Sequence, residues 1–246
     1  MKIAGIILAA GKGTRMKSNL PKMLHKVAGV ELVGHVVRIM RIAGIDDITV
    51  VVSRDFAHSA ELHQALLPHV RVSVQAEQFG TADALQAAQC EVESADTIIV
   101  APVDVVLVTE ELVKQLLDQH ITSNSLATIV AARVDDPTGL GRIKMDDYGS
   151  PSAILEQHEA DDQLLRSKLI NTAWYCFDNR WIWGELDKVR AADTGEFYLP
   201  RIIASAAAQD RSGVVISNDP DVGIGVNDKL QLSRVESIMR QRTNQA

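Results

Sequence analysis

Short apolar runs alternate with segments of helical periodicity along the first half of the chain. The run Ile3–Leu8 is apolar throughout and predicts a buried strand. The segment Glu31–Ala43 places its valines and Met40 on one helical face, and Gly44 follows as a helix stop. The same patterns predict further strands at Asp47–Ser53, Val70–Gln75, Thr97–Ala101 and Leu126–Arg133. They predict further helices at His58–Leu67, Thr81–Gln89 and Glu110–Gln119.

The pattern changes after about residue 135. Glycine-containing turns at Gly139–Ile143 and Gly149–Pro151 bracket short strands and predict hairpins. Strands that alternate with helices indicate βαβ units, so we expect an α/β fold with a Rossmann-like, mostly parallel sheet flanked by helices. Ligands would then bind at the carboxyl ends of the strands. The remaining predicted elements are strands at Leu169–Phe177 and Val214–Ser217 and helices at Trp181–Val189, Tyr198–Ala207 and Lys229–Arg242.

The composition is that of an ordinary soluble globular protein, with 46% hydrophobic and 23% charged residues. The net charge of −7 makes nonspecific binding of nucleic acid or of an anionic membrane a poor hypothesis. The start of the chain lacks the pattern of a signal peptide, and no apolar run reaches the length of a membrane span. We therefore expect a cytoplasmic protein without a nucleic-acid or membrane partner. Cys90 and Cys176 stand in no metal-binding or disulfide pattern.

A glycine-containing, cationic segment follows the first predicted strand. The segment Leu8–Met16 (LAAGKGTRM) contains two glycines, which allow a tight turn and a close approach of the backbone to a ligand. Lys12, Arg15 and Lys22 crowd the same short stretch of chain. Backbone N–H groups and cations at the end of a strand favour an anion, above all phosphate. The sequence therefore predicts nucleotide chemistry.

Further recognisable segments follow this one in order along the chain. They are Gln75–Thr81 (QAEQFGT), Asp135–Ile143 (DDPTGLGRI), Ile154–Glu156, Ile170–Thr172, Gly195–Tyr198 (GEFY) and Gly225–Asp228 (GVND). The ordered set resembles the sugar-1-phosphate nucleotidyltransferase family. Within that family it is most similar to the N-terminal uridyltransferase domains of the bifunctional bacterial N-acetylglucosamine-1-phosphate uridyltransferases. The resemblance covers nearly the whole chain.

The resemblance implies a fold of the nucleotide-diphospho-sugar transferase type, in which a β-hairpin-rich portion binds the sugar. Residues 1–228 would form the nucleotidyltransferase domain, and residues 229–246 would form a C-terminal helix. The bifunctional relatives continue into a left-handed β-helix that carries acetyltransferase activity and forms trimers. We expect no such β-helix domain here, and the sequence leaves the oligomeric state open.

The resemblance also implies Mg²⁺-dependent transfer of UMP from UTP to N-acetylglucosamine-1-phosphate, giving the cell-wall precursor UDP-N-acetylglucosamine and pyrophosphate. By the same resemblance Arg15 and Lys22 are catalytic cations, and Asp104 and Asn227 hold the Mg²⁺. A carboxylate and an amide oxygen suit this hard cation. The implied nucleotide-binding residues are Leu8, Ala9, Ala10, Gly11, Gly13, Gln75, Gly80 and Thr81. The implied sugar-binding residues are Gly141, Glu156 and Asn171.

Some of these residues also fit other interpretations. Thr81 and Asn227 stand where N-caps of the following helices are expected. Lys12 is equally compatible with a phosphate contact and with an exposed surface position. Gln75 carries an amide that can donate and accept at once, which suits the hydrogen-bonding edge of uracil.

The chain departs from the family's pattern around the predicted metal and sugar sites. The family's Tyr-Gly-Asp-x-Pro is here Pro102–Val106, with Val103 in place of the glycine, and its Asn-Thr-Gly ends here in Ala173. Pro200–Arg201 replaces Thr-Asp, and Asp83 stands where a histidine is common. Two alternatives therefore stay open. One is the same reaction on another sugar-1-phosphate, such as glucose-1-phosphate, and the other is a nucleotide-binding regulatory protein with weakened catalysis.

Overall fold

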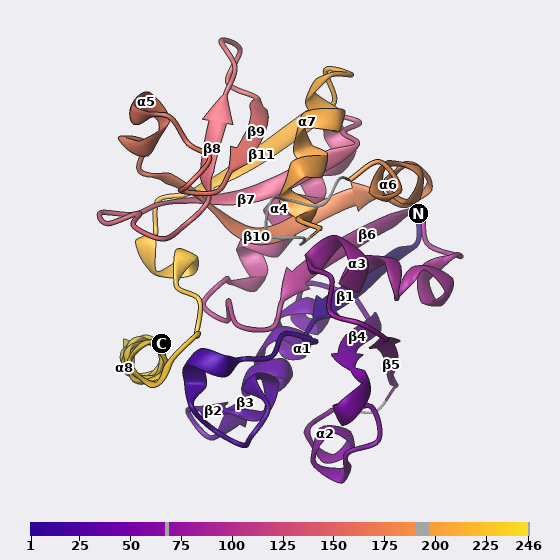
Figure 1. The fold of residues 1–246 in the computed structure, drawn as a ribbon, viewed down its shortest axis with the longest axis vertical. Coiled ribbons are helices and arrows are strands. Elements are labelled where there is room, and N and C mark those ends of the chain that lie inside the picture. Colours follow the sequence, from indigo (N-terminus) through magenta and orange to yellow (C-terminus); the bar gives the residue numbers. More distant parts are fainter. Residues whose placement is uncertain (67–68, 190–196, 246) are drawn as a thin grey trace.

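The computed structural model describes residues 1–66, 69–189 and 197–245. A central sheet carries helices on both faces (Figure 1). Its strands are β1 (Ile3–Leu8), β4 (Asp47–Ser53), β5 (Val70–Gln75), β6 (Thr97–Pro102), β7 (Ala127–Arg133), β8 (Arg142–Met145), β9 (Pro151–Leu155), β10 (Leu169–Asp178) and β11 (Ser212–Ser217). A separate hairpin pairs β2 (Lys26–Val27) with β3 (Val30–Glu31). The helices are α1 (Leu32–Ile42), α2 (Ala60–Ala65), α3 (Thr81–Gln86), α4 (Glu110–Thr122), α5 (Asp162–Leu165), α6 (Asn179–Leu186), α7 (Ile202–Ala207) and α8 (Lys229–Gln245).

The strand order reverses around β1. The order along the sheet is β11-β7-β10-β6-β1-β4-β5. β1 pairs in parallel with β4 on one side and with β6 on the other, whereas β10 runs antiparallel to both β6 and β7. The first two crossovers lead the chain away from β1 toward β5, and the return to β6 opens a switch point beside β1. In such sheets ligands bind outside the carboxyl ends of the strands at the switch point. The predicted mostly parallel α/β sheet is confirmed.

Two hydrophobic cores cover the two faces of the sheet. Helices α1 and α4 pack on one face, and α3, α6 and α7 pack on the other (Figure 1). Successive side chains of β1 supply both cores, since Ile6 belongs to one and Ile7 to the other. Burial on both faces explains why β1 is apolar throughout. The same burial on both faces fixes the position of the carboxyl end of β1.

The predicted strands Ile3–Leu8, Asp47–Ser53 and Val70–Gln75 have the bounds that the structure shows. Helix ends differ more. The predicted helix Tyr198–Ala207 is a 3-10 turn at Leu199–Arg201 followed by α7. The predicted helix His58–Leu67 runs into residue 67, outside the described residues, and α2 is shorter. The pattern missed α5 and the β2–β3 hairpin, because elements of two to four residues are too short to show a period.

Ala173 occupies a backbone conformation that favours glycine. Its φ is +63°, and it lies where the pairing of β10 with β7 shifts register between Asn171 and Tyr175. The Asn171 Oδ1 atom accepts a hydrogen bond of 3.0 Å from the N–H of Ala173, which closes the local turn. A Cβ in the left-handed region costs roughly 1–2 kcal/mol. The departure from the family's glycine at this position therefore strains the backbone of the strand.

We expect Ala173→Gly to stabilise the protein. Relief of the left-handed strain exceeds the added chain entropy of glycine, for a net gain of roughly 0.5–1 kcal/mol. Thermal or urea unfolding measures the gain, which corresponds to about 1–4 °C in Tm for a chain of this size. Ala153→Gly in the extended strand β9 is the matched control and should lower stability. A loss of stability in Ala173→Gly would contradict the account.

Candidate active site

The loops after β1 and β6 lie side by side at the switch point. The N–H of Val103 donates to the carbonyl oxygen of Leu8 at 3.1 Å, so the first residue beyond β6 is tied to the end of β1. Asp104 follows directly. Its backbone carbonyl accepts a 2.9 Å hydrogen bond from the N–H of Val226, in the loop before α8. Three segments far apart in sequence therefore meet at one edge of the sheet.

A lysine joins the two residues predicted to hold the metal. The Nζ atom of Lys22 forms an ion pair with the carboxylate of Asp104 and donates to Oδ1 of Asn227 at 2.8 Å. The side chains of Lys22 and Asp104 are only 12% and 18% exposed. The prediction had grouped Lys22 with the phosphates and Asp104 with Asn227. The structure brings all three into one cluster.

Asn227 is not the N-cap of α8, so that interpretation was wrong. The cap is Asp228, whose Oδ1 accepts from the N–H of Gln231 at 2.8 Å. The side chain of Gln231 reaches back and accepts from the N–H of Asn227 at 2.7 Å. The N–H groups of Asn227 and Gln231 at the start of α8 therefore have side-chain acceptors. The Oδ1 atom of Asn227 is not needed as a cap and faces Lys22.

The donor set of the cluster fits a Mg²⁺ ion. A carboxylate oxygen and an amide oxygen both contact the same ammonium group, so they face a common cation position. The described residues contain no group of three or more His, Cys, Asp or Glu that could form an all-protein metal cage. Mg²⁺ is commonly held by one or two protein oxygens together with phosphate oxygens and water. Asp104 and Asn227 would be the protein's share of such a site.

The unusual valines around Asp104 do not enter the cluster. Val103, Val105 and Val106 are buried in the core on the α1 face. The indole N–H of Trp174 donates to the carbonyl oxygen of Val105 at 3.1 Å. Val103, which stands in place of the family's glycine, directs its side chain into the core. The departure at Pro102–Val106 therefore changes the packing behind Asp104 and leaves its carboxylate exposed to the site.

The predicted phosphate loop offers free backbone donors. The N–H groups of Ala10, Gly11 and Gly13 have no hydrogen-bond acceptor among the described residues. The N–H of Ala9, by contrast, donates to Val51 at 2.8 Å and continues the sheet. Leu8 is the last residue of β1.

Gly13 brings this loop against Lys22. It has φ +59°, and a Cβ built on it would lie 2.9 Å from the Cβ of Lys22. Arg15 and Lys12 are exposed, and neither forms a hydrogen bond or ion pair with another described residue. The structure therefore positions Lys22 and leaves Arg15 free to meet a ligand.

The predicted base segment is built around Gln75 at the end of β5. Its Nε2 atom donates to the carbonyl oxygen of Gly80 at 3.1 Å and to the carboxylate of Asp83 at 2.6 Å. Both N–H groups of this amide are therefore used within the protein, whereas its carbonyl oxygen accepts from none of the described residues. The base contact of Gln75 stays a prediction, with this oxygen as the group available for it.

Gly80 and Thr81 fasten the base segment to the chain around Phe197. Gly80 has φ +129°, and a Cβ on it would lie 2.5 Å from the carbonyl oxygen of Phe197. Thr81 does not cap α3, as one interpretation had it. Gly80 is the N-cap residue, and the hydroxyl of Thr81 accepts from the N–H of Leu199 at 3.0 Å. Within the described residues its O–H proton has no acceptor.

Sequence reasoning gave no role to Gln78. Its Nε2 atom donates to the carbonyl oxygen of Ala10, and this bond ties the base segment to the phosphate loop. Gln78 lies inside the segment Gln75–Thr81 that carries the resemblance, but its position in the sequence does not indicate that its side chain contacts Ala10. The bond therefore links the two segments that are predicted to bind the nucleotide.

The predicted sugar-binding residues also gather. The N–H of Asn171 donates to the carbonyl oxygen of Gly141 at 3.0 Å, and a Cβ on Gly141 would lie 3.4 Å from Oε1 of Glu156. The Nδ2 atom of Asn171 donates to the buried hydroxyl of Tyr175 at 2.7 Å, a partner that the sequence did not suggest. Among the described residues no hydrogen bond connects this group to the cluster of Lys22.

The carboxyl of Glu156 is costly to ionise. Burial raises its pKa, and the nearby carboxylate of Glu159 raises it further. Glu159 itself accepts from the N–H of Glu156 at 3.1 Å and pairs with Arg201 at 2.7 Å. Arg201 is one of the departures from the family's pattern. It anchors the neighbour of Glu156 rather than contacting Glu156.

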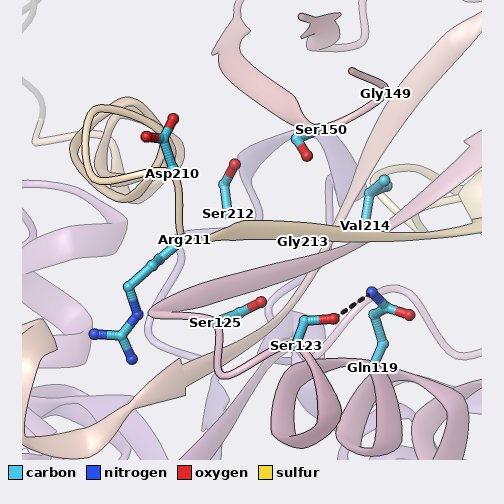
Figure 2. Close-up of a pocket in the computed structure, with 10 residues that line it drawn as sticks. All are labelled: Gln119, Ser123, Ser125, Gly149, Ser150, Asp210, Arg211, Ser212, Gly213 and Val214. Carbon is cyan, nitrogen blue, oxygen red and sulfur yellow. Dashed lines mark hydrogen bonds between the residues drawn. The ribbon is translucent and has the colours of Figure 1, made fainter.

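A pocket of about 240 Å³ lies at the opposite edge of the sheet, where β7 and β11 begin (Figure 2). Its walls carry the hydroxyls of Ser123, Ser125, Ser150 and Ser212. Arg211 points away from these serines and donates to Asn124 (Figure 2). None of the predicted site residues lines this pocket. We therefore place the candidate active site at the switch point.

Comparison with known proteins places the chain in a family. The family model of the MobA-like NTP transferase domain matches residues 5–142. The bifunctional protein GlmU of Syntrophomonas wolfei is 36% identical over 99% of this chain and 54% of its own length. GlmU of Streptococcus gordonii is 39% identical over 98% of this chain and 52% of its own length. The chain thus spans about half the length of the curated relatives it matches.

A solved structure shows the same fold at low identity. It is a crystal structure from Bacillus anthracis described as a glucose-1-phosphate thymidylyltransferase in complex with a sucrose. It is 18% identical, has a TM-score of 0.78, and the match covers 97% of this chain and 95% of that one. Within the ranges described here, no helix is long and apolar enough to cross a membrane. The matched family model spans residues 5–142 of the 246, a range that includes most of β1 and Asp104. Because the match covers more than half of the chain, the chain belongs to the MobA-like NTP transferase domain family and is a nucleotidyltransferase.

Proposed function

We propose that this chain transfers UMP from UTP to N-acetylglucosamine-1-phosphate with Mg²⁺, giving UDP-N-acetylglucosamine and pyrophosphate. The observation that carries the proposal is the cluster in which Lys22 bridges Asp104 and Asn227 beside the phosphate loop. It combines oxygen ligands for a divalent cation with free N–H donors for phosphates. The ordered segments shared with the uridyltransferase domains, and the similarity to GlmU, support the choice of reaction.

The chemistry needs charge neutralisation rather than a base. An oxygen of the sugar phosphate attacks the α-phosphorus of UTP in line with the departing pyrophosphate. That oxygen is already anionic, so no side chain has to remove a proton. The N–H groups of Ala10, Gly11 and Gly13 would hold the triphosphate, and Arg15 and Lys22 would balance the charge that spreads over the transferring group. Mg²⁺ held by Asp104 and Asn227 would supply further positive charge.

The same transfer to glucose-1-phosphate is a second candidate. Both polar ends of the Asn171 side chain are already used, by Tyr175 and by the N–H of Ala173. Each end has one position left, a single N–H and a single lone pair, which halves the capacity of the side chain to bind an N-acetyl group. Glu156 is the predicted sugar contact whose carboxylate makes no hydrogen bond with any described residue, so both of its oxygens can accept from sugar hydroxyls.

Pyrophosphate release tests the proposal directly. We expect release with UTP and Mg²⁺ when N-acetylglucosamine-1-phosphate is the acceptor, and no release without metal. A panel that adds glucose-1-phosphate, mannose-1-phosphate and glucosamine-1-phosphate ranks the acceptors. Release with glucose-1-phosphate alone would favour the second candidate. Binding of UTP without release from any acceptor would contradict both and point to a regulatory protein.

Asp104→Asn should lose most of the Mg²⁺-dependent turnover. The change keeps the shape of the side chain and an oxygen for Lys22, but it removes the negative charge that a divalent cation requires. We expect a fall on the order of 10²–10³ in kcat, comparable to the loss of one preorganised electrostatic group. Asp118→Asn, on the exposed face of α4, is the control with the same chemical change. Equal activity of the two variants would show that Asp104 does not hold the metal.

Glu156→Gln should stabilise the folded chain at pH 8 and gain less as the pH falls. The pKa of Glu156 is raised in the folded state, so the stability linked to its protonated form is present at low pH and is lost as the pH rises through that pKa. At pH 8 the neutral amide avoids this cost. Urea unfolding at pH 8 and pH 5 measures the difference, with Glu77→Gln in an exposed loop as the control. A gain that did not depend on pH would contradict the electrostatic explanation.

A further inference from the structure

The amide of Gln75 is held in one orientation by two acceptors. Gln75 is 4% exposed, and its Nε2 atom reaches both the carbonyl oxygen of Gly80 and the carboxylate of Asp83. A carbonyl oxygen and an ionised carboxylate can only accept hydrogen bonds. Rotating the amide by 180° would turn its oxygen toward two other oxygens. The NH₂ group therefore has to face Gly80 and Asp83.

This orientation leaves an acceptor open at the predicted base site. The Oε1 atom of Gln75 accepts no hydrogen bond from the described residues. It is also absent from the buried polar atoms that lack a partner, so a small part of it is reached by solvent. An acceptor at the edge of a nearly buried side chain is available to a ligand that displaces solvent. A ligand that brings an N–H group would satisfy it.

We propose that Asp83 is a positioning residue for base recognition: it locks Gln75 so that the amide presents only its oxygen to the nucleobase. The inference rests on the proposed use of UTP. Uracil carries a proton on N3 and can donate to Oε1 of Gln75. Cytosine has an unprotonated N3, whose lone pair would face the same oxygen.

Asp83 suits this role better than the residue common in the resembling family. A histidine at this position can donate or accept, depending on its tautomer, whereas an ionised aspartate only accepts. Asp83 also lies in the first turn of α3, where a carboxylate helps the helix. A purely structural role there would change stability but not the preference between two pyrimidine bases. The base preference is therefore the decisive readout.

Isothermal titration calorimetry with the full chain and Mg²⁺ tests the inference. The probes are UTP, CTP and N3-methyl-UTP, without an acceptor sugar. We expect the unaltered protein to bind UTP at least tenfold more tightly than either analogue. Asp83→Ala should reduce both ratios by about tenfold, the equivalent of roughly one hydrogen bond. Asp83→Asn should keep the ratios, because its amide can turn an oxygen toward Nε2 of Gln75.

Two further variants separate positioning from a general effect of charge. Glu77→Ala removes one negative charge from the exposed surface of the same segment and should leave the ratios unchanged. In a Gln75→Ala background, Asp83→Ala should have no further effect on the ratios, since it acts through Gln75. Thermal unfolding verifies that each variant is folded. The N3-methyl-UTP measurement on the unaltered protein needs no variant at all.

The outcomes distinguish this inference from the proposed function. If UTP is preferred but Asp83→Ala keeps both ratios, Asp83 does not position Gln75, and the proposed reaction stands. If UTP, CTP and N3-methyl-UTP bind alike while UTP still supports pyrophosphate release, the inference again fails alone. If no triphosphate binds, the proposed function and the inference fail together.

Discussion

The ammonium group of Lys22 is the contact on which the site depends. It joins the segment after β1 to the loop after β6 and to the loop before α8. These three segments reach one point because β1 sits at the switch point of the sheet. Removing one partner from a largely buried charge pair leaves the other charge uncompensated, so the three side chains constrain one another strongly. The cluster directs a carboxylate oxygen and an amide oxygen at one ammonium group. Beside it lies a loop in which the N–H groups of Ala10, Gly11 and Gly13 have no acceptor among the described residues.

The strands of the sheet could be predicted well from the sequence because burial on both faces demands an unbroken apolar run. β1, β4 and β5 show this most clearly. Helix ends could not be placed as well, since a helix that packs on a sheet stops where tertiary contacts stop. The backbone conformation of Ala173 could not be predicted from the sequence either. Alanine disfavours the left-handed region, and the pairing of β10 with its neighbours imposes that conformation here.

The residues of the site could be predicted more readily than their partners. The resemblance picked out Asp104 and Asn227, and the structure places both against Lys22. A residue type fixes what a side chain can donate or accept, but not which neighbour takes it up. For that reason Asn227 and Thr81 were compatible with N-caps until the structure showed Asp228 and Gly80 in those positions. The direction of Val103, into the core, is equally invisible in the sequence.

The two halves of the site differ in how many of their polar groups lack a partner within the described residues. On the predicted nucleotide side the N–H groups of Ala10, Gly11 and Gly13 and the oxygen of Gln75 have no partner among the described residues. On the predicted sugar side Asn171 uses one N–H and one oxygen lone pair within the protein and keeps one of each. Gly11 is exposed and the oxygen of Gln75 is reached by solvent, so a ligand at these positions has to replace water. A group that loses water without gaining a new partner costs about 1–3 kcal/mol, so a ligand that fails to pair with these positions is disfavoured by that amount.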